Sequence, residues 1–379
     1  MKSKRIIQLV MMLCVISPYV ALAQFSSGST GADGTLNVTI PTTLVLPTNG
    51  VFNFTTINVS ANLFFTKNAL NTPAYLLATR NVVINGNIII DGGNAGLPSS
   101  SIAGLGGLGG FDGGQGGVQG FLLGDGQGPG GGLAEVDQRA VFGLLLPSGN
   151  SNIYGNTLLV PLIGGSGGAG RSVNGGGGGG GAILLASSTK ITMTGGIYAR
   201  GGNGANTVGL VAGGGSGGSI RLVAPVVDGT GELQTFGGSG VNGRGGFGRV
   251  RIDTLDRFAW RTLNLANAGK WTVGIQMFVF PPGNPKLDII SAASTPIIEG
   301  TNAPVIVYLP VGVNSNQLVR VQARNFTNDI PIRVKITPEN APSATFDGII
   351  QQSSGNPPFA DVQVTLPVDT VCHVHAWTR

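Results

Sequence analysis

A unit of three short segments occurs three times in this chain, and it constrains the fold more than any other feature. Each copy holds an apolar stretch ending in alanine, a second stretch rich in β-branched residues, and a third stretch closed by a glycine pair. The copies begin at Ala74, Ala182 and Ser219, and their glycine pairs are Gly92-Gly93, Gly201-Gly202 and Gly237-Gly238. One such unit cannot bury its apolar side alone, so neighbouring copies must stack. The repeat therefore predicts an all-β solenoid.

Strand patterns on both sides of the repeats extend this stack. Residues 35–40, 51–59 and 62–66 alternate or cluster apolar side chains as strands do, and we expect them to form a first coil or a cap. Arg249–Asp253 is a further alternating strand. The segment that follows it carries Trp260 and Trp271, which we expect to cap the opposite end.

Glycine is concentrated in one part of the chain, because 54 of its 66 glycines lie between Asp91 and Val250. Two series recur at every third residue: Gly104, Gly107, Gly110, Gly113 and Gly116, and Gly237, Gly240, Gly243 and Gly246. A period of three is that of a polyproline-II or polyglycine-II helix, in which neighbouring chains can approach closely. We therefore expect ordered loops beside the solenoid. The composition alone is also typical of a flexible linker, above all at Gly175–Gly181.

The stretch 134–162 returns to ordinary composition inside the glycine-rich region, and it is interpreted as an irregular rung of the solenoid. Insertions on one face of a repeat array often carry binding surfaces.

The last 94 residues, 286–379, differ in composition because they hold only four glycines. They follow a proline-rich hinge at residues 281–285. Short apolar strands separated by Pro, Asn and Gly turns predict an immunoglobulin-like β-sandwich. The strand candidates are residues 305–309, 318–323, 332–337, 362–366 and 371–377. The resulting division is a signal peptide at 1–23, a glycine-rich solenoid domain at 24–280, the hinge, and the sandwich at 286–379.

The first residues are typical of an export signal. Three basic residues precede an apolar run from Ile6 to Ile16, and Ala21-Leu22-Ala23 fits a cleavage site. The run is too short for a transmembrane anchor. Cleavage would leave 19 Lys and Arg against 17 Asp and Glu, a balance that does not favour nucleic acid as a partner. It would also leave Cys372 as the sole cysteine, so no intramolecular disulfide is expected.

Carboxylates of the solenoid are candidates for sugar chemistry, because cleavage of a glycosidic bond needs two positioned carboxyl groups. The candidates are Asp91, Asp112, Asp125, Glu135, Asp137, Asp228, Glu232, Asp253 and Asp256. Their spacing does not bring any two to equivalent positions of the repeat. Aspartate beside glycine is an ordinary turn residue, and that is the interpretation we favour.

The final strand offers a second constellation. His373 and His375 share one face and could supply two metal ligands, whereas Cys372 lies on the opposite, apolar face. A metal site usually needs three or four ligands, so we expect a solvated histidine pair and a buried, unreactive thiol.

The Leu-Leu-Ala-Ser/Thr, Val-x-Ile-x-Gly-x-Ile and Gly-Gly-x-Gly elements between Thr35 and Asp253 resemble the right-handed parallel β-helices of the pectate-lyase-like superfamily, in particular its glycine-rich exported bacterial proteins. The resemblance implies the same fold here. Members that hydrolyse pectin carry Asp-Asp, Gly-His-Gly and Arg-x-Lys motifs, and the solenoid domain has no histidine, Asp-Asp or Arg-x-Lys. No catalytic residue is therefore transferred.

Together these patterns favour an exported, non-enzymatic protein that is adhesive or structural and binds a cell surface, a matrix component or a polysaccharide. We assign no catalytic, cofactor-binding or metal-binding residue and expect no cofactor. The main alternative is a polysaccharide lyase or glycoside hydrolase on the solenoid. A further alternative is ice binding by a flat face, for which Thr192 and Thr194 are the only Thr-x-Thr pair within the three repeats.

Overall fold

A computed structural model describes residues 25–379 except for 98–100, 118–123, 135, 143–152, 208–209, 241–242, 282, 284, 299–304, 340, 368–369 and 379. The predicted signal peptide at 1–23 and one candidate acid, Glu135, lie outside the described residues. So do parts of the predicted hinge at 281–285.

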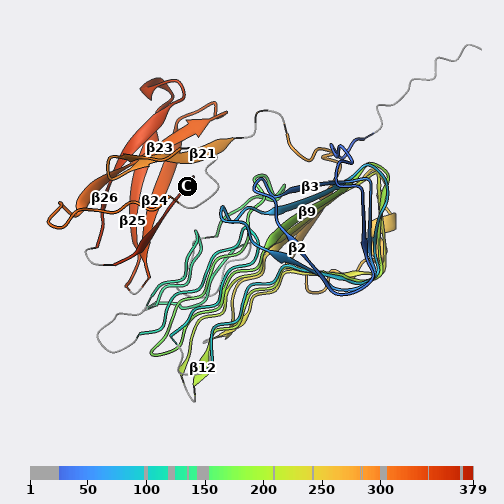
Figure 1. Ribbon diagram of the computed structural model, residues 1–379, viewed down its shortest axis with the longest axis horizontal. Coiled ribbons are helices and arrows are strands. Elements are labelled where there is room, and N and C mark those ends of the chain that lie inside the picture. Colours follow the sequence, from blue (N-terminus) through green and yellow to red (C-terminus); the bar gives the residue numbers. More distant parts are fainter. Residues whose placement is uncertain are drawn as a thin grey trace, which may run out of the picture.

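Three parallel sheets, here called A, B and C, dominate the first part of the chain, and the chain visits them in the recurring order C, A, B (Figure 1). Sheet A consists of β1 (Thr35–Val38), β4 (Thr56–Val59), β7 (Val82–Ile84), β10 (Lys190–Met193) and β15 (Val226–Gly229). Sheet B consists of β2 (Thr42–Val45), β5 (Leu63–Thr66), β8 (Asn87–Ile89), β11 (Gly196–Tyr198) and β16 (Glu232–Gln234). Sheet C consists of β3 (Val51–Phe54), β6 (Ala74–Ala78), β9 (Ala182–Ser187), β14 (Ser219–Val223), β19 (Arg249–Asp253) and β20 (Lys270–Gly274).

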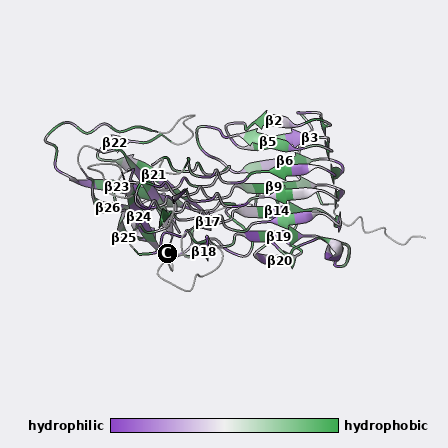
Figure 2. Cartoon of the chain, turned by 90° about the horizontal axis from the view of Figure 1, so that it is seen from below, coloured by the Kyte–Doolittle hydropathy of each residue, from purple (hydrophilic) through white to green (hydrophobic). Residues whose placement is uncertain are grey.

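The three copies of the repeat lie directly on one another, as the sequence predicts. In sheet C, β9 pairs with β6 on one side and with β14 on the other, although a long insertion separates β8 from β9 in the sequence. Figure 2 shows the strands of this sheet as successive layers of one stack. The all-β repeat is thereby confirmed, and its arrangement is compatible with a β-helix.

Ladders of identical or similar apolar residues fill the interior of the stack. The register places equivalent side chains above one another in each sheet. The inward-facing apolar ones form three ladders, one in each sheet, whose members are fully buried. The ladders are Ile57, Val82, Ile191 and Val227 in sheet A, Leu63, Ile88, Ile197 and Leu233 in sheet B, and Leu76, Leu185, Leu222 and Ile252 in sheet C. Burial of each such side chain contributes about 1.5–3 kcal/mol, so the ladders hold the coils together.

The segment after β19 covers one end of the stack, as expected. The short 3₁₀ helix η1 (Ala259–Thr262) packs against β15, and β20 adds a last strand to sheet C. The rings of Trp260 and Trp271 lie 5.6 Å apart between these two elements.

Every glycine-rich insertion leaves the stack at the same corner, where a strand of sheet B is followed by a strand of sheet C. The insertions run from β8 to β9, from β11 to β14 and from β16 to β19. The last two end in short antiparallel hairpins, β12 (Asn206–Thr207) with β13 (Leu210–Val211) and β17 (Ser239–Gly240) with β18 (Gly243–Arg244). Together the insertions form a bundle of extended chains beside the stack, which we call the glycine array (Figure 1).

Hydrogen bonds in the glycine array follow a period of three. In the central segment 176–181, residues three apart donate to the same neighbouring segment, so three successive residues serve three different neighbours. The pairs are Gly176 to Gly114 and Gly179 to Phe111, Gly177 to Gly213 and Gly180 to Ser216, and Gly178 to Gly93 and Gly181 to Ile90, with N to O distances of 2.8–2.9 Å. A threefold extended helix has this symmetry. The composition of Gly175–Gly181 is also typical of a flexible linker, but this segment is an ordered inner chain of the array.

Close packing explains why the array needs glycine. A Cβ atom on Gly177 would lie 2.0 Å from the carbonyl oxygen of Gly202, far inside van der Waals contact.

The described part of 134–162 adds no strand to the three sheets. Instead it joins the array and covers sheet C, so it is not a rung of the stack.

The C-terminal part forms two antiparallel sheets that enclose a second apolar core, an arrangement consistent with a β-sandwich. One sheet has the order β22 (Thr295–Pro296), β21 (Lys286–Ala292), β23 (Asn316–Arg324), β26 (Phe359–Thr365). The other has the order β25 (Ala344–Ile350), β24 (Ile330–Pro338), β27 (Cys372–Thr378).

Four of the five predicted strands coincide with β23, β24, β26 and β27, and the strand predicted at 305–309 is wrong. That segment makes no strand pairing, and Ile306 and Tyr308 are 69% and 85% exposed. Its apolar residues therefore have no core to face, and alternation alone could not reveal this. The sequence pattern missed β21 and β25.

The sandwich packs against the glycine array through the outer face of the sheet β25-β24-β27. Lys335 on β24 is 3% exposed and lies 3.4 Å and 3.5 Å from the carbonyl oxygens of Gly126 and Gly128. Ser343 donates its hydroxyl to Asp125 over 2.6 Å.

Candidate functional site

The candidate acids are each held by their own partners. Five of the eight that are described form ion pairs: Asp91 with Arg200, Asp112 with Lys67, Asp137 with Arg139, Asp228 with Lys190, and Asp253 with Arg221 and Arg251. The other three accept from neutral donors: Asp125 from Ala134 and Ser343, Glu232 from Asn267, and Asp256 from Phe258 and Ala259. None of these contacts joins two acids.

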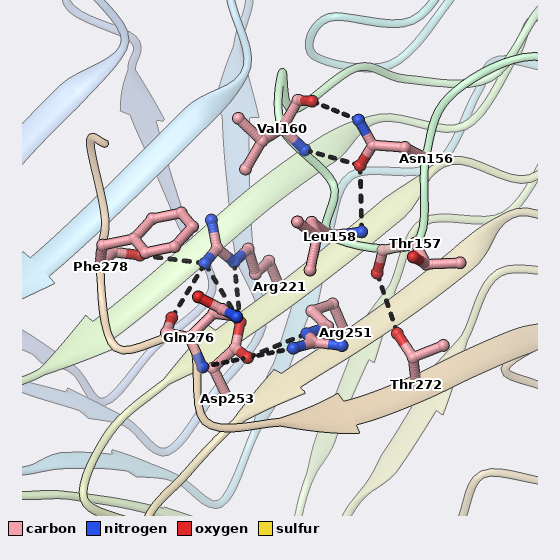
Figure 3. Close-up of polar contacts among 10 residues, drawn as sticks. All are labelled: Asn156, Thr157, Leu158, Val160, Arg221, Arg251, Asp253, Thr272, Gln276 and Phe278. Atoms are coloured by element: carbon pink, nitrogen blue, oxygen red, sulfur yellow. Dashed lines mark hydrogen bonds and ion pairs between the residues drawn. The ribbon is translucent and has the colours of Figure 1, made fainter. Parts of the chain in front are cut away.

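The most buried polar cluster of the stack lies on the outer face of sheet C and centres on Asp253 (Figure 3). Register pairing sets Arg221 of β14 beside Arg251 of β19. Arg221 donates to one carboxylate oxygen of Asp253 over 3.1 Å and 3.2 Å, and Arg251 donates to the other over 2.6 Å and 2.9 Å. Arg221 and Asp253 are at most 1% exposed.

The same cluster fastens the segment after β20 across the sheet. The Arg221 guanidinium also donates to the carbonyl oxygens of Gln276 and Phe278 over 3.3 Å and 3.0 Å, and the Gln276 amide donates to Asp253 over 3.0 Å. The Phe278 ring lies 4.8 Å from the guanidinium carbon. The cluster's hydrogen bonds and ion pairs tie two strands and the returning segment together, which makes this cluster a structural clasp.

A second covering segment lies beside the clasp. Asn156 closes a turn by accepting from the amides of Leu158 and Val160, and Thr272 of β20 donates to the Thr157 carbonyl over 2.9 Å (Figure 3). Leu159 inserts into the apolar cluster over sheet C. The sheet's outer face is thus sealed here from a large ligand.

The histidine pair lies where the sandwich meets the array. His375 pairs with Lys335 in register, and its ring and the Phe111 ring form a T-shaped pair with centroids 5.4 Å apart. Burial, together with His373 and Lys335, lowers the pKa of His375 to about 3. His375 keeps partial exposure, but its Nδ1 atom is buried where the sandwich docks on the array, and a sequence pattern does not show docking.

His373 lies 3.6 Å from Glu339, and no group of three or more His, Cys, Asp or Glu residues suited to a metal occurs in the described ranges. Burial and then Glu339 raise the pKa of Cys372 to about 11, which keeps this half-buried thiol protonated.

The far end of the glycine array, where its chains turn back, presents exposed apolar side chains. We call this surface the array tip and define it by Leu97, Ile102, Val173 and Leu210, which are 82%, 64%, 38% and 39% exposed. By contrast, the glycines of the inner segment 175–181 are all buried.

Hydrogen bonds tie the turns of the array tip to one another. The Gly96 amide donates to the Ile102 carbonyl over 3.0 Å within one turn, and the Ala95 amide donates to the Asn203 carbonyl of the next insertion over 2.9 Å. The Asn174 side chain donates to the Leu210 carbonyl over 2.5 Å and to the Thr207 hydroxyl over 2.8 Å. Residues that flank the turns of two different insertions are thus held side by side.

Fold and site define an all-β protein of stacked parallel coils with an antiparallel C-terminal unit, in which a bundle of glycine-rich chains carries a surface of loops. No protein-family profile, no curated protein and no solved structure matches the chain. Within the described residues, helices are too short and polar to be candidates for a membrane span.

Sequence reasoning missed both the clasp and the array tip. The clasp left a signal, because Arg221, Arg251 and Asp253 interrupt strands that are otherwise apolar. The array tip left a weaker signal, since single apolar residues such as Ile102 and Leu210 stand at the ends of glycine-rich runs. Which runs would turn back side by side depends on the packing of the whole array.

Proposed function

We propose that this protein is an exported, non-enzymatic adhesive protein that binds a cell surface, a matrix component or a polysaccharide through the array tip. The observation that carries the proposal is the placement of four exposed apolar side chains on tethered turns at one end of a buried glycine scaffold. Rigid scaffolds that present loops are a common basis of recognition. Exposed apolar side chains gathered on one surface favour contact with a partner.

The scaffold suits this role because its own side chains do little chemistry. Glycine segments bond to each other through backbone groups, so residues at the turns can vary without disturbing the interior.

The proposal also specifies the hand of the stacked coils and the type of the C-terminal sandwich. We infer a right-handed parallel β-helix, supported by the strong preference of parallel crossover connections for that hand. We also infer an immunoglobulin-like module. The sheet orders β21-β23-β26 and β25-β24-β27 support it, because they match the A-B-E and C′-C-F strands of such sandwiches.

The proposal is tested by retention on a polysaccharide array and on bacterial cells, using the chain from Gln24. A variant with Leu97→Ser, Ile102→Ser and Leu210→Ser should lose retention at least about tenfold, because each buried apolar contact contributes about 1 kcal/mol or more. A matched control carries Ile40→Ser and Val45→Ser, two side chains that are 70% and 73% exposed away from the array tip. This control should bind as the unaltered chain does.

Two results would overturn the proposal. Equal losses in both variants would mean general stickiness of exposed apolar groups. Release of reducing-end or unsaturated products would instead favour a hydrolase or lyase.

A further inference from the structure

The chemistry of the array tip distinguishes among the surfaces that it could bind. Its four exposed side chains, those of Leu97, Ile102, Val173 and Leu210, are all aliphatic. The hairpin β12-β13, which carries Leu210, lies at the end of the array farthest from the stack (Figure 1). Aliphatic groups make no directional contacts and gain free energy from any apolar phase that removes them from water. The hydrocarbon of a lipid bilayer is such a phase.

Hydrogen bonds and close packing join the turns that carry these side chains. The Asn174 side chain donates to the Leu210 carbonyl over 2.5 Å. A Cβ atom on Gly175 would lie only 2.3 Å from the Ile102 carbonyl oxygen, so these two backbones touch. That carbonyl also accepts from the Gly96 amide over 3.0 Å. Each of the four apolar residues thus belongs to this network or is next in sequence to one of its members.

Polar groups at the array tip already bond to one another. The Asn174 side chain also donates to the Thr207 hydroxyl over 2.8 Å. The Ala205 amide donates to the Gly175 carbonyl over 3.0 Å, and the Ala212 amide donates to the Ala205 carbonyl over 2.9 Å. Recognition of a saccharide needs polar groups that are free to bond with it, whereas a bilayer favours groups that are already paired, because an unpaired amide is costly in hydrocarbon. These contacts therefore favour lipid over saccharide.

The charge around the array tip has one sign. Residues 92–111 and 138–227, which supply its four apolar side chains, contain no aspartate or glutamate. Four cations of the second range, Arg139, Lys190, Arg200 and Arg221, pair with acids elsewhere. The fifth, Arg171, forms no ion pair within the described residues, and two backbone hydrogen bonds of 2.9 Å join it to Asn174. A cation beside apolar side chains complements an anionic lipid surface.

We propose that the array tip inserts into the interface of an anionic lipid bilayer. The aliphatic side chains lie among the acyl chains, and Arg171 lies against the lipid phosphates. Interfacial insertion of this kind is shallow, about 5–10 Å deep, so the rest of the array stays in water. This inference rests on the proposed adhesive function, and it names the lipid bilayer as the component of a cell surface that the array tip contacts.

The experiment is flotation of the chain from Gln24 with vesicles of equimolar phosphatidylcholine and phosphatidylglycerol, with which we expect it to float. The variant with Leu97→Ser, Ile102→Ser and Leu210→Ser should lower the partition coefficient about tenfold or more, because each change removes apolar surface from the bilayer. The matched control with Ile40→Ser and Val45→Ser, at exposed positions of the stack, should float as the unaltered chain does. Circular dichroism checks that both variants are folded.

Arg171→Gln tests the part played by charge. It should weaken binding to the mixed vesicles about fivefold and leave binding to pure phosphatidylcholine vesicles unchanged, because only the anionic surface attracts the cation. The matched control is Arg257→Gln, which removes an exposed cation from the segment that covers the end of the stack and should have no effect. Equal weakening by both variants would indicate general charge attraction and overturn the assigned contact.

The remaining outcomes separate the lipid partner from the adhesive function. No flotation, or equal flotation of the serine variant of the array tip, would overturn the lipid proposal. If the array tip still mediates retention on cells or polysaccharides in that case, adhesion stands and only its partner is wrong. Flotation that depends on the array tip, without retention on cells, would instead support the lipid contact and overturn the adhesive function.

Discussion

At the scale of single residues, the buried ionic groups divide into those with a full set of partners and those without. Asp253 accepts from two guanidinium groups and one amide, whereas the Nδ1 atom of His375 is buried and has no hydrogen-bond partner within the described ranges. Replacing Asp253 would leave buried positive charges without a counter-charge, and protonating His375 would add a buried positive charge. Both changes should lower the free energy of unfolding.

Asp253→Asn should strongly destabilise the stack, because it leaves two buried guanidinium groups without a counter-charge. We expect a loss of about 3–5 kcal/mol in the free energy of unfolding, measured by urea denaturation. The matched control is Asp361→Asn, which breaks an exposed pair with Arg320 and should change stability little. A loss for Asp253→Asn no larger than the control's would contradict the role of the clasp.

His375 should make the sandwich and its docking sensitive to acid. Its pKa is about 3 in the folded chain against an ordinary 6.5, so the unfolded chain binds a proton more readily. The stabilisation is therefore complete above pH 6.5 and is lost progressively as the pH falls towards 3. Between pH 7.5 and 4.5 we expect a loss of about 2–3 kcal/mol from this residue.

Urea denaturation of the unaltered chain and of His375→Gln at both pH values measures this effect. The variant should show a shallower decline. His373→Gln, whose ring is 42% exposed, should keep most of the original pH dependence. Parallel declines in the unaltered chain and His375→Gln would assign the acid sensitivity to other groups.

At the scale of elements, strands and glycine chains are stabilised by different means. Strands are held by ladders of buried apolar side chains, whereas the glycine array is held by backbone hydrogen bonds at distances that exclude a Cβ atom. The strands should therefore tolerate apolar substitutions that conserve volume, and the array should not tolerate any added side chain in its interior.

Gly177→Ala tests this sensitivity. Its Cβ would lie 2.0 Å from the Gly202 carbonyl oxygen, so the backbone must shift, and we expect a loss of about 1–3 kcal/mol in thermal unfolding. Gly246→Ala is the matched control, because its Cβ would meet its nearest atom at 3.2 Å. Alanine at this position lowers the conformational entropy of the unfolded chain, and this stabilising effect should offset most of the cost of crowding. Equal destabilisation would mean that the flexibility of glycine matters more than its size.

At the scale of the whole molecule, the glycine array lies between the stack and the sandwich and contacts both. Its contact with the sandwich includes Lys335, a buried ammonium group with two long hydrogen bonds to glycine carbonyls. Burial lowers the pKa of Lys335, and Asp125 offsets this only in part.

Lys335→Met should leave the free energy of unfolding unchanged or raise it by about 1–2 kcal/mol, because the apolar side chain removes the cost of burying the charge. The matched control is Lys67→Met. Lys67 is also partly buried, but it donates to the Gly106 carbonyl over 3.0 Å and faces Asp112 at 3.7 Å, so its loss should destabilise. Differential scanning calorimetry compares the two, and a strong destabilisation by Lys335→Met would mean that the ammonium group is a required anchor.

The stack could be predicted from the sequence because its repeat is local: Leu76, Leu185 and Leu222 occupy the same place in three similar segments. The period of three also predicted that the glycine segments would be ordered. The clasp at Asp253 could not be foreseen, because it depends on which strands become neighbours and on the return of Gln276 across the sheet. The surroundings of His375 depend on docking between distant parts of the chain, which no local pattern encodes.

All glycine-rich insertions leave the stack at one corner, and this has a consequence for how such a chain can change over time. A longer insertion adds further chains to the array without altering the register of the three sheets, because coil pairing resumes at the next strand of sheet C. Loop closure penalises added length only weakly. The corner therefore separates the coils, which must stay constant for folding, from the insertions, whose turns can vary as long as their inner chains stay glycine.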